Sequence, residues 1–176
     1  DVLTSFHLLS DYVLELLPQM KDPVVVAADL GFAKKGRNFA AKIDAPIAFI
    51  EKRRSGVEDA PAAMTIIGDV NQRDVIVVDD EVDTGGSVVE AVKMVKSHGA
   101  RNVYLVFVHP VLSANAAERL AELPVTRIIT TDTIPIPPEK RALLGDKLVV
   151  LSVAPLLAEV ILRAHEGRSV GELFHE

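Results

Sequence analysis

The strongest structural signal in this sequence is the stretch Asp74-Val-Ile-Val-Val-Asp-Asp-Glu-Val-Asp-Thr-Gly-Gly-Ser87. Its four consecutive β-branched residues, Val75 to Val78, predict a strand that is buried on both faces. Two carboxylates follow the strand, and a glycine-containing loop then opens a segment with apolar residues at helical spacing between Val88 and Val95. A buried strand, a polar loop and an amphipathic helix in this order predict one unit of a parallel α/β sheet.

The rest of the chain alternates in the same way. Short apolar runs predict further strands at 24–28, 47–50, 64–67, 103–108, 127–131 and 148–151. Apolar residues at helical spacing predict helices at 9–17, 33–43, 114–123 and 156–166. The charged stretch Lys52–Pro61 shows no periodicity and predicts a mobile loop, and the prolines of Ile134–Pro138 predict a turn. We therefore expect a three-layer α/β fold, in which helices cover both faces of a central parallel sheet, in a single domain spanning residues 1–176.

Composition narrows the classes of function. A formal net charge of −6 argues against general nucleic-acid binding, which needs an extended basic surface. The absence of cysteine excludes disulfides and thiolate metal sites. No apolar run is long enough for a membrane span, and no signal peptide is visible, so we expect a cytoplasmic protein. The hydrophobic content of 49% indicates buried strands together with a subunit interface, and we expect a homo-oligomer, at least a dimer.

The loop after the predicted central strand has the composition of an anion site. Backbone N–H groups at a helix start, together with the helix dipole, attract an anion. Gly85 and Gly86 allow the backbone to approach a phosphate closely, and the hydroxyls of Thr84 and Ser87 can add donors. The alternative is an ordinary helix cap at Thr84, which a lone Gly-Gly-Ser would favour. The two acids directly before this loop favour the binding site.

The adjacent acids Asp79 and Asp80 would repel a phosphate that touched them. They are suited to the other end of a sugar phosphate, where they accept hydrogen bonds from ring hydroxyls or hold Mg²⁺ through water. An acid pair and an anion loop a few residues apart therefore fit ribose 5-phosphate. The sequence has neither the lysine-containing loop of the nucleotide P-loop nor the three-glycine dinucleotide fingerprint.

At these residues the chain resembles the type I phosphoribosyltransferase superfamily, whose signature is two acids, a short spacer and Thr-Gly-Thr/Ser. Further segments resemble the ribose-phosphate pyrophosphokinases, namely Ile66–Val70, Asp132–Pro135, Leu151–Ala158 and His165–Val170. The resemblance implies a phosphoribosyltransferase type I-like fold. It also implies that ATP and ribose 5-phosphate are the substrates, with Mg²⁺ required. The family transfers the diphosphoryl group of ATP to the C1 hydroxyl, which gives phosphoribosyl pyrophosphate and AMP.

The resemblance also assigns roles to residues. It implies that Asp79 and Asp80 meet the ribose hydroxyls, and that the 5-phosphate is held by Asp83, Thr84, Gly85, Gly86 and Ser87. It implies a diphosphate loop that includes Asp29, Gly31 and Lys34, with Asp29 as the metal-binding acid.

The basic segment Glu51–Arg54 matches the catalytic loop of the family. The resemblance implies that Lys52 and Arg54 grip the transferring phosphates, whereas the residues alone favour a solvated basic run. Phe32 stands where the family has glycine, and we expect its side chain to obstruct close backbone approach at the diphosphate loop.

Two other functions stay open at this stage. One is a phosphoribosyltransferase of nucleotide salvage, which usually stacks its base on an aromatic residue. Six Phe and two Tyr, mostly within predicted core elements, weaken that reading. The other is a catalytically silent regulatory subunit that binds ribose phosphate. The chain resembles the second domain of the pyrophosphokinases, and we expect the isolated domain to bind ribose 5-phosphate even where turnover needs the first domain.

Overall fold

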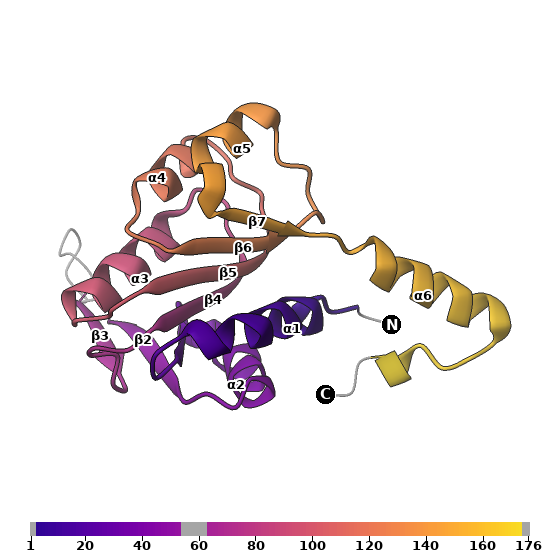
Figure 1. Ribbon diagram of the computed structural model, residues 1–176, viewed down its shortest axis with the longest axis horizontal. Helices are drawn as coiled ribbons and strands as arrows, with labels where there is room; N and C mark the ends of the chain where they lie inside the picture. The colour runs from indigo at the N-terminus through magenta and orange to yellow at the C-terminus, as the bar shows by residue number, and fades with distance from the viewer. Residues whose placement is uncertain (1–2, 54–62, 174–176) are drawn as a thin grey trace.

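The computed structural model describes residues 3–53 and 63–173. Within that part, a seven-stranded sheet has the strand order β3-β2-β1-β4-β5-β6-β7 (Figure 1). The strands are β1 (Val24–Ala27), β2 (Ile47–Arg53), β3 (Ala63–Ile67), β4 (Val75–Glu81), β5 (Val103–His109), β6 (Arg127–Thr131) and β7 (Leu148–Leu151). The α-helices are α1 (Phe6–Leu16), α2 (Ala33–Lys42), α3 (Gly86–Ser97), α4 (Ala116–Glu122), α5 (Pro138–Leu144) and α6 (Ala154–Glu166).

Strand β4 is the centre of the sheet, as its β-branched run predicts. It pairs in parallel with β1 on one side and β5 on the other, so that Val77 lies between Val26 and Leu105. Its first four residues are buried because helices cover both faces. The predicted three-layer α/β fold is confirmed by this arrangement.

The two faces of the sheet have separate cores. Helices α3, α4 and α5 pack on one face, where Val92, Leu120 and Leu144 belong to one buried cluster with Val77 and neighbouring strand residues. Helices α1 and α2 pack on the other face, where Leu9 and Phe39 belong to the second cluster. The alternation of side chains along each strand supplies both cores at once.

The sheet is parallel, as predicted, except at one edge. Strand β3 runs antiparallel to β2, with Phe49 opposite Ile67 and Lys52 opposite Met64. The connection of nine residues, 54–62, is shorter than the crossover of about a dozen that a parallel pair needs. The predicted loop Lys52–Pro61 is wrong at its start, because β2 continues through Arg53. The remainder of that predicted loop lies outside the described residues.

Two helices differ from the predicted pattern. Helix α4 begins at Ala116, two residues later than predicted, because Leu112 and Ala114 have φ values of 48° and 47° and place the preceding segment in a left-handed conformation. Helix α5 follows the proline-rich turn and was not predicted. Its first residue is Pro138, a position where proline fits because the first N–H of a helix has no partner in the helix.

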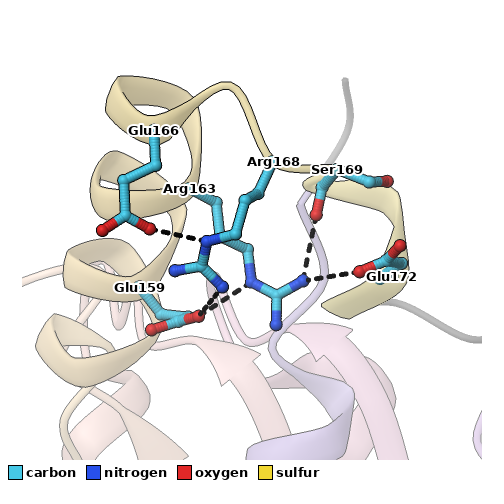
Figure 2. A network of polar contacts seen from close by, with 6 residues as sticks. All are labelled: Glu159, Arg163, Glu166, Arg168, Ser169 and Glu172. Atoms are coloured by element: carbon cyan, nitrogen blue, oxygen red, sulfur yellow. Dashed lines mark hydrogen bonds and ion pairs between the residues drawn. The ribbon is translucent and has the colours of Figure 1, made fainter.

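Helix α6 extends away from the sheet beyond β7 (Figure 1), and none of its residues is buried. Gly167 ends the helix in a left-handed conformation, as predicted, and the chain then folds back. Figure 2 shows that Arg163 holds this return by donating to Glu159, the carbonyl of Ser169 and Glu172. Among the described residues, no helix combines the length and apolar character that crossing a bilayer would require.

Candidate functional site

The carboxyl ends of β1 and β4 lie side by side, with Ala27 opposite Val78. In parallel α/β sheets, ligands bind beyond this edge. Here the two loops that leave the strands enclose a cleft of about 450 Å³. Its lining consists of Asp29, Gly31, Phe32, Lys35 and the continuous run from Asp79 to Val88. The sheet therefore brings together the predicted acid pair, the predicted anion loop and part of the predicted diphosphate loop.

We call Asp83–Ser87 the glycine loop. Gly85 has a φ of 77°, a conformation that favours glycine, and it immediately precedes α3. The N–H of Val89 donates to the carbonyl of Gly85 at 3.0 Å, which closes the first turn of the helix. The first amides of a helix have no partner inside the helix, and in this chain the start of α3 lines the cleft. This geometry can bind an anion.

The two acids at the end of β4 have different surroundings. Asp79 is half-buried, and its Oδ1 accepts the N–H of Asp80 at 3.0 Å. Burial, with added repulsion from the charges of Asp80 and Asp29, raises the pKa of Asp79 to about 6. Asp80 is also half-buried, with 46% of its side chain exposed, and its Oδ2 lies 3.4 Å from Nζ of Lys35. Two adjacent carboxylates therefore offer one acid that titrates near neutrality and one that is paired with a cation.

The loop after β1 presents a third acid. Asp29 is exposed, and its Oδ1 accepts the N–H of Gly31 at 2.5 Å, while its carbonyl accepts the N–H of Phe32 at 3.1 Å. A Cβ atom at Gly31 would lie 3.0 Å from that carboxylate oxygen, so a larger residue would push the acid away. The turn thus fixes the position of Asp29 at the cleft.

Phe32, which we expect to obstruct close backbone approach at the diphosphate loop, has most of its side chain in the core. Its side chain is only 5% exposed, and its ring packs against Phe6 of α1 with centroids 5.4 Å apart. Most of the bulk of the ring therefore lies in the core between the sheet and helices α1 and α2, and only its edge reaches the cleft wall. This contact ties the loop after β1 to α1.

The structure separates the two lysines that follow Phe32. Lys34 is exposed at the start of α2 and does not line the cleft. Lys35 does line it, with Nζ close to Asp80 and 5.6 Å from the centroid of the Phe32 ring. The sequence pattern favoured Lys34 because it comes first after the loop. Neighbouring residues on a helix face different directions, and in α2 it is Lys35 that faces the cleft.

The predicted catalytic pair is only partly within the described residues. Lys52 lies in β2, and its backbone pairs with Met64 of β3. Strand β2 is the parallel neighbour of β1, so its carboxyl end lies at the same edge of the sheet as the cleft. Arg54 lies outside the described residues.

The predicted magnesium site rests on Asp29. Across residues 3–53 and 63–173, the structure has no group of three or more His, Asp or Glu side chains that could hold a metal ion. Mg²⁺ does not need such a group, because it is commonly bound through one or two carboxylates together with water and substrate phosphates. The exposed Asp29 at the cleft fits that kind of coordination.

Comparisons with known proteins agree with this geometry. Residues 56–175 match the family described as "Phosphoribosyl synthetase-associated domain". A ribose-phosphate pyrophosphokinase from Caldanaerobacter subterraneus subsp. tengcongensis is 49% identical over 153 residues, which cover 87% of this chain and 47% of that protein. A second one, from Deinococcus radiodurans, is 41% identical over 99% of this chain and 54% of its own length. The chain thus spans about half the length of the curated relatives that it matches.

Solved structures give the same result. The phosphoribosylpyrophosphate synthetase from Mycobacterium smegmatis superposes with a TM-score of 0.83 at 36% identity, over 93% of this chain and 51% of that one. Adenine phosphoribosyltransferase from Leishmania donovani superposes with a TM-score of 0.52 at 20% identity, over 84% of this chain and 64% of that one. The second likeness concerns the fold alone.

Proposed function

The chain belongs to the ribose-phosphate pyrophosphokinase family, and we propose that its cleft binds ribose 5-phosphate and presents the C1 hydroxyl to ATP. The observation that supports this proposal is the single cleft shared by the glycine loop, Asp79 and Asp80. A helix start suited to an anion and carboxylates suited to hydroxyls match the two ends of a sugar phosphate.

In the proposed complex, the 5-phosphate accepts hydrogen bonds from backbone amides of the glycine loop and from the hydroxyls of Thr84 and Ser87. The ribose hydroxyls donate to Asp79 and Asp80 at the other end of the cleft. Asp80 then exchanges its ion pair with Lys35 for bonds to the sugar, which frees the ammonium group. This exchange has a low cost, since both side chains are about half exposed in the pair.

The proposed reaction moves a diphosphoryl group. The C1 hydroxyl oxygen of ribose 5-phosphate attacks the β-phosphorus of ATP and its proton is released to solvent. The bond from that phosphorus to the oxygen shared with the α-phosphate breaks, and this oxygen leaves as part of AMP. Such transfers depend on positioned positive charge more than on covalent help. We propose that Lys52, Arg54 and Lys35 supply this charge, with Lys35 in place of the less well placed Lys34.

Asp29 would hold Mg²⁺ together with phosphate oxygens. A bound Mg²⁺ neutralises charge that develops on the transferring phosphates. The carboxylate of Asp29 is already oriented for this role by its bond from the N–H of Gly31.

A salvage phosphoribosyltransferase finds less support. Among the described residues, Phe32 is the sole aromatic side chain that lines the cleft, and its ring is almost entirely buried. It leaves no exposed ring face on which a nucleobase could stack.

An assay of the products tests the proposal. The chain is incubated with Mg²⁺, ATP and ribose 5-phosphate, and AMP is measured with and without the complementary half of a full-length relative. We expect AMP release when both halves are present. Nucleotide formed from phosphoribosyl pyrophosphate and a base, without AMP release, would favour the transferase. Binding without any turnover in either mixture would favour the silent subunit.

A further inference from the structure

The segment between β5 and α4, residues 110–115, forms a backing for the start of the glycine loop. The N–H of Val82 donates to the carbonyl of His109 at 3.0 Å, and the carbonyl of Val82 accepts the N–H of Leu112 at 2.8 Å. Val82 is the residue that immediately precedes the glycine loop. The end of β5 therefore fixes the N–H of Val82, and the 110–115 segment fixes its carbonyl.

Within this segment, Leu112 has an unfavourable backbone conformation. Its φ is 48°, which costs a residue with a Cβ atom about 1–2 kcal/mol. Its side chain is 1% exposed and packs in the core with α3 and α4. Its carbonyl accepts a hydrogen bond from Nζ of Lys140, a half-buried residue of α5, at 2.6 Å. A charged donor makes a strong hydrogen bond, and here it stabilises the strained residue.

Helix α4 supports the other end of the glycine loop. A Cβ atom on Gly85 would lie 3.7 Å from Cβ of Ala116, so the glycine rests directly on the first turn of α4. Arg119 of the same helix reaches the carbonyl of Thr84, with 3.5 Å between the donor and acceptor atoms. The 110–115 segment thus supports the residue before the glycine loop, and α4 supports the end of the loop where it meets α3.

We propose that Lys140 is a positioning residue for the glycine loop. It acts through Leu112 and Val82 and does not touch the substrate. Loss of its ammonium group leaves the Leu112 carbonyl without its charged donor, so that Leu112 relaxes and Val82 shifts with it. Phosphate binding by backbone amides depends on the direction of every N–H group, and it weakens when the loop moves. This inference rests on the proposed binding of ribose 5-phosphate.

Lys147 provides a matched control. It is half-buried like Lys140, and its Nζ donates to the carbonyls of Ala121 and Leu123, at the far end of α4. Lys140→Met and Lys147→Met therefore remove the same charge, together with one bond to a backbone carbonyl before α4 and two bonds to backbone carbonyls at its end, respectively. Lys140→Arg keeps the charge and the donor.

The test measures the affinity for ribose 5-phosphate by titration calorimetry, the melting temperature, and backbone hydrogen exchange without ligand. We expect Lys140→Met to bind roughly tenfold more weakly, with Lys147→Met within about twofold of the wild type and Lys140→Arg close to it. We also expect faster exchange at Leu112 and in the glycine loop for Lys140→Met alone, while the two methionine variants lose comparable melting temperature.

Equal affinities and equal exchange in the two methionine variants would overturn the positioning role and leave the proposed function intact. A wild-type chain that binds no ribose 5-phosphate would overturn the proposed function. In that case the hydrogen-exchange data still test whether Lys140 positions the glycine loop. Unchanged exchange at Leu112 and in the glycine loop of Lys140→Met would contradict that role.

Discussion

At the scale of single residues, the two acids that end β4 show how burial changes chemistry between neighbours. Burial raises the pKa of Asp79, whereas Asp80 faces Lys35 with about half of its side chain exposed. The ionised carboxylate is a better acceptor for hydrogen bonds from ribose hydroxyls than the protonated acid, and Asp79 is ionised above its pKa. Binding of the sugar is therefore expected to strengthen as the pH rises through about 6.

Replacement of Asp79 by Asn tests the burial of this acid. An acid whose pKa is higher in the folded state binds more protons when folded, so it lowers stability as the pH rises from about 4 to about 6. Asn carries no charge and keeps the acceptor for the N–H of Asp80. We expect Asp79→Asn to be more stable than the wild type at pH 8 by roughly 2 kcal/mol, with part of the full effect lost to solvent at the cleft.

Urea unfolding at several pH values measures this difference, and Asp146→Asn on the exposed surface serves as the control. The gap between Asp79→Asn and wild type should close below about pH 3, where Asp79 is protonated in both the folded and the unfolded state. A stability difference that does not depend on pH would mean that burial does not raise the pKa of Asp79.

Gly85 and Gly86 allow a second comparison between neighbours. Gly85→Ala places a residue with a Cβ atom in a left-handed backbone conformation, which should lower stability by about 1 kcal/mol. The same variant should bind ribose 5-phosphate more weakly. At Gly86 the nearest atom to a new Cβ would be Oγ1 of Thr84 at 3.9 Å, so Gly86→Ala should fold as well as the wild type. Thermal unfolding of the two variants measures the contrast, and equal melting temperatures would refute the conformational argument.

At the scale of elements, the acid just before β4 makes buried contacts that stabilise the fold, whereas the acids at its carboxyl end line the cleft. Asp74, just before the strand, is fully buried and accepts hydrogen bonds from the guanidinium of Arg101 and the N–H groups of Lys21 and Asn102. Burial by itself would raise the pKa of Asp74, but these donors lower it below its ordinary value. The acids at the carboxyl end instead face the cleft.

Asp74→Asn and Asp80→Asn should therefore have opposite effects. The first loses its bonds to Arg101 and leaves buried donors unmatched, which should lower stability by about 2–4 kcal/mol with little change in sugar affinity. The second should weaken binding of ribose 5-phosphate with little change in stability, since its ion pair is exposed. Chemical denaturation and calorimetry on both variants give the result. A loss of sugar affinity in Asp74→Asn at full stability would contradict this division of β4.

Helix α6 depends on its own polar contacts. The side chain of Arg163 is 17% exposed and joins the helix to the segment after Gly167, whereas Arg168 is 45% exposed and pairs mainly with Glu166 (Figure 2). We expect Arg163→Met to speed hydrogen exchange in residues 168–173 well beyond the effect of Arg168→Met. Similar exchange in the two variants would show that the segment is held by something other than Arg163.

At the scale of the whole molecule, the parts that sequence predicts well are those with local causes. The run Val75–Val78 predicts the central strand because only burial on both faces suits it, and the following loop predicts the start of a helix. The strand β3 was predicted, but its antiparallel direction was not, because an apolar run does not reveal the direction of its pairing. The extension of β2 was missed because Lys52 and Arg53 are charged, although strand residues near a sheet edge tolerate charge.

The unpredicted parts of the site have tertiary causes. Lys35 enters the cleft because the turn of α2 and the Phe32 ring place it opposite Asp80, and nothing in its local sequence distinguishes it from Lys34. Phe32 is accommodated because α1 supplies Phe6 as its partner. The role of Lys140 depends on a contact between α5 and the segment before α4, 28 residues apart. Such contacts exist only once the fold has formed.

The whole molecule also sets the scope of the proposed activity. The chain spans about half the length of its curated relatives, so diphosphoryl transfer is proposed on the basis of the family, while sugar phosphate binding is proposed on the basis of the cleft. Helix α6 extends from the sheet with Leu157, Ile161 and Leu162 exposed, and it adds nothing to the cleft.

The most direct measurement is a crystal structure of the chain with ribose 5-phosphate bound. We expect the phosphate to accept hydrogen bonds from backbone amides of the glycine loop, and the ribose hydroxyls to lie against Asp79 and Asp80. A sugar phosphate bound elsewhere on the molecule, or bound in this cleft with its phosphate away from the start of α3, would contradict the proposed site.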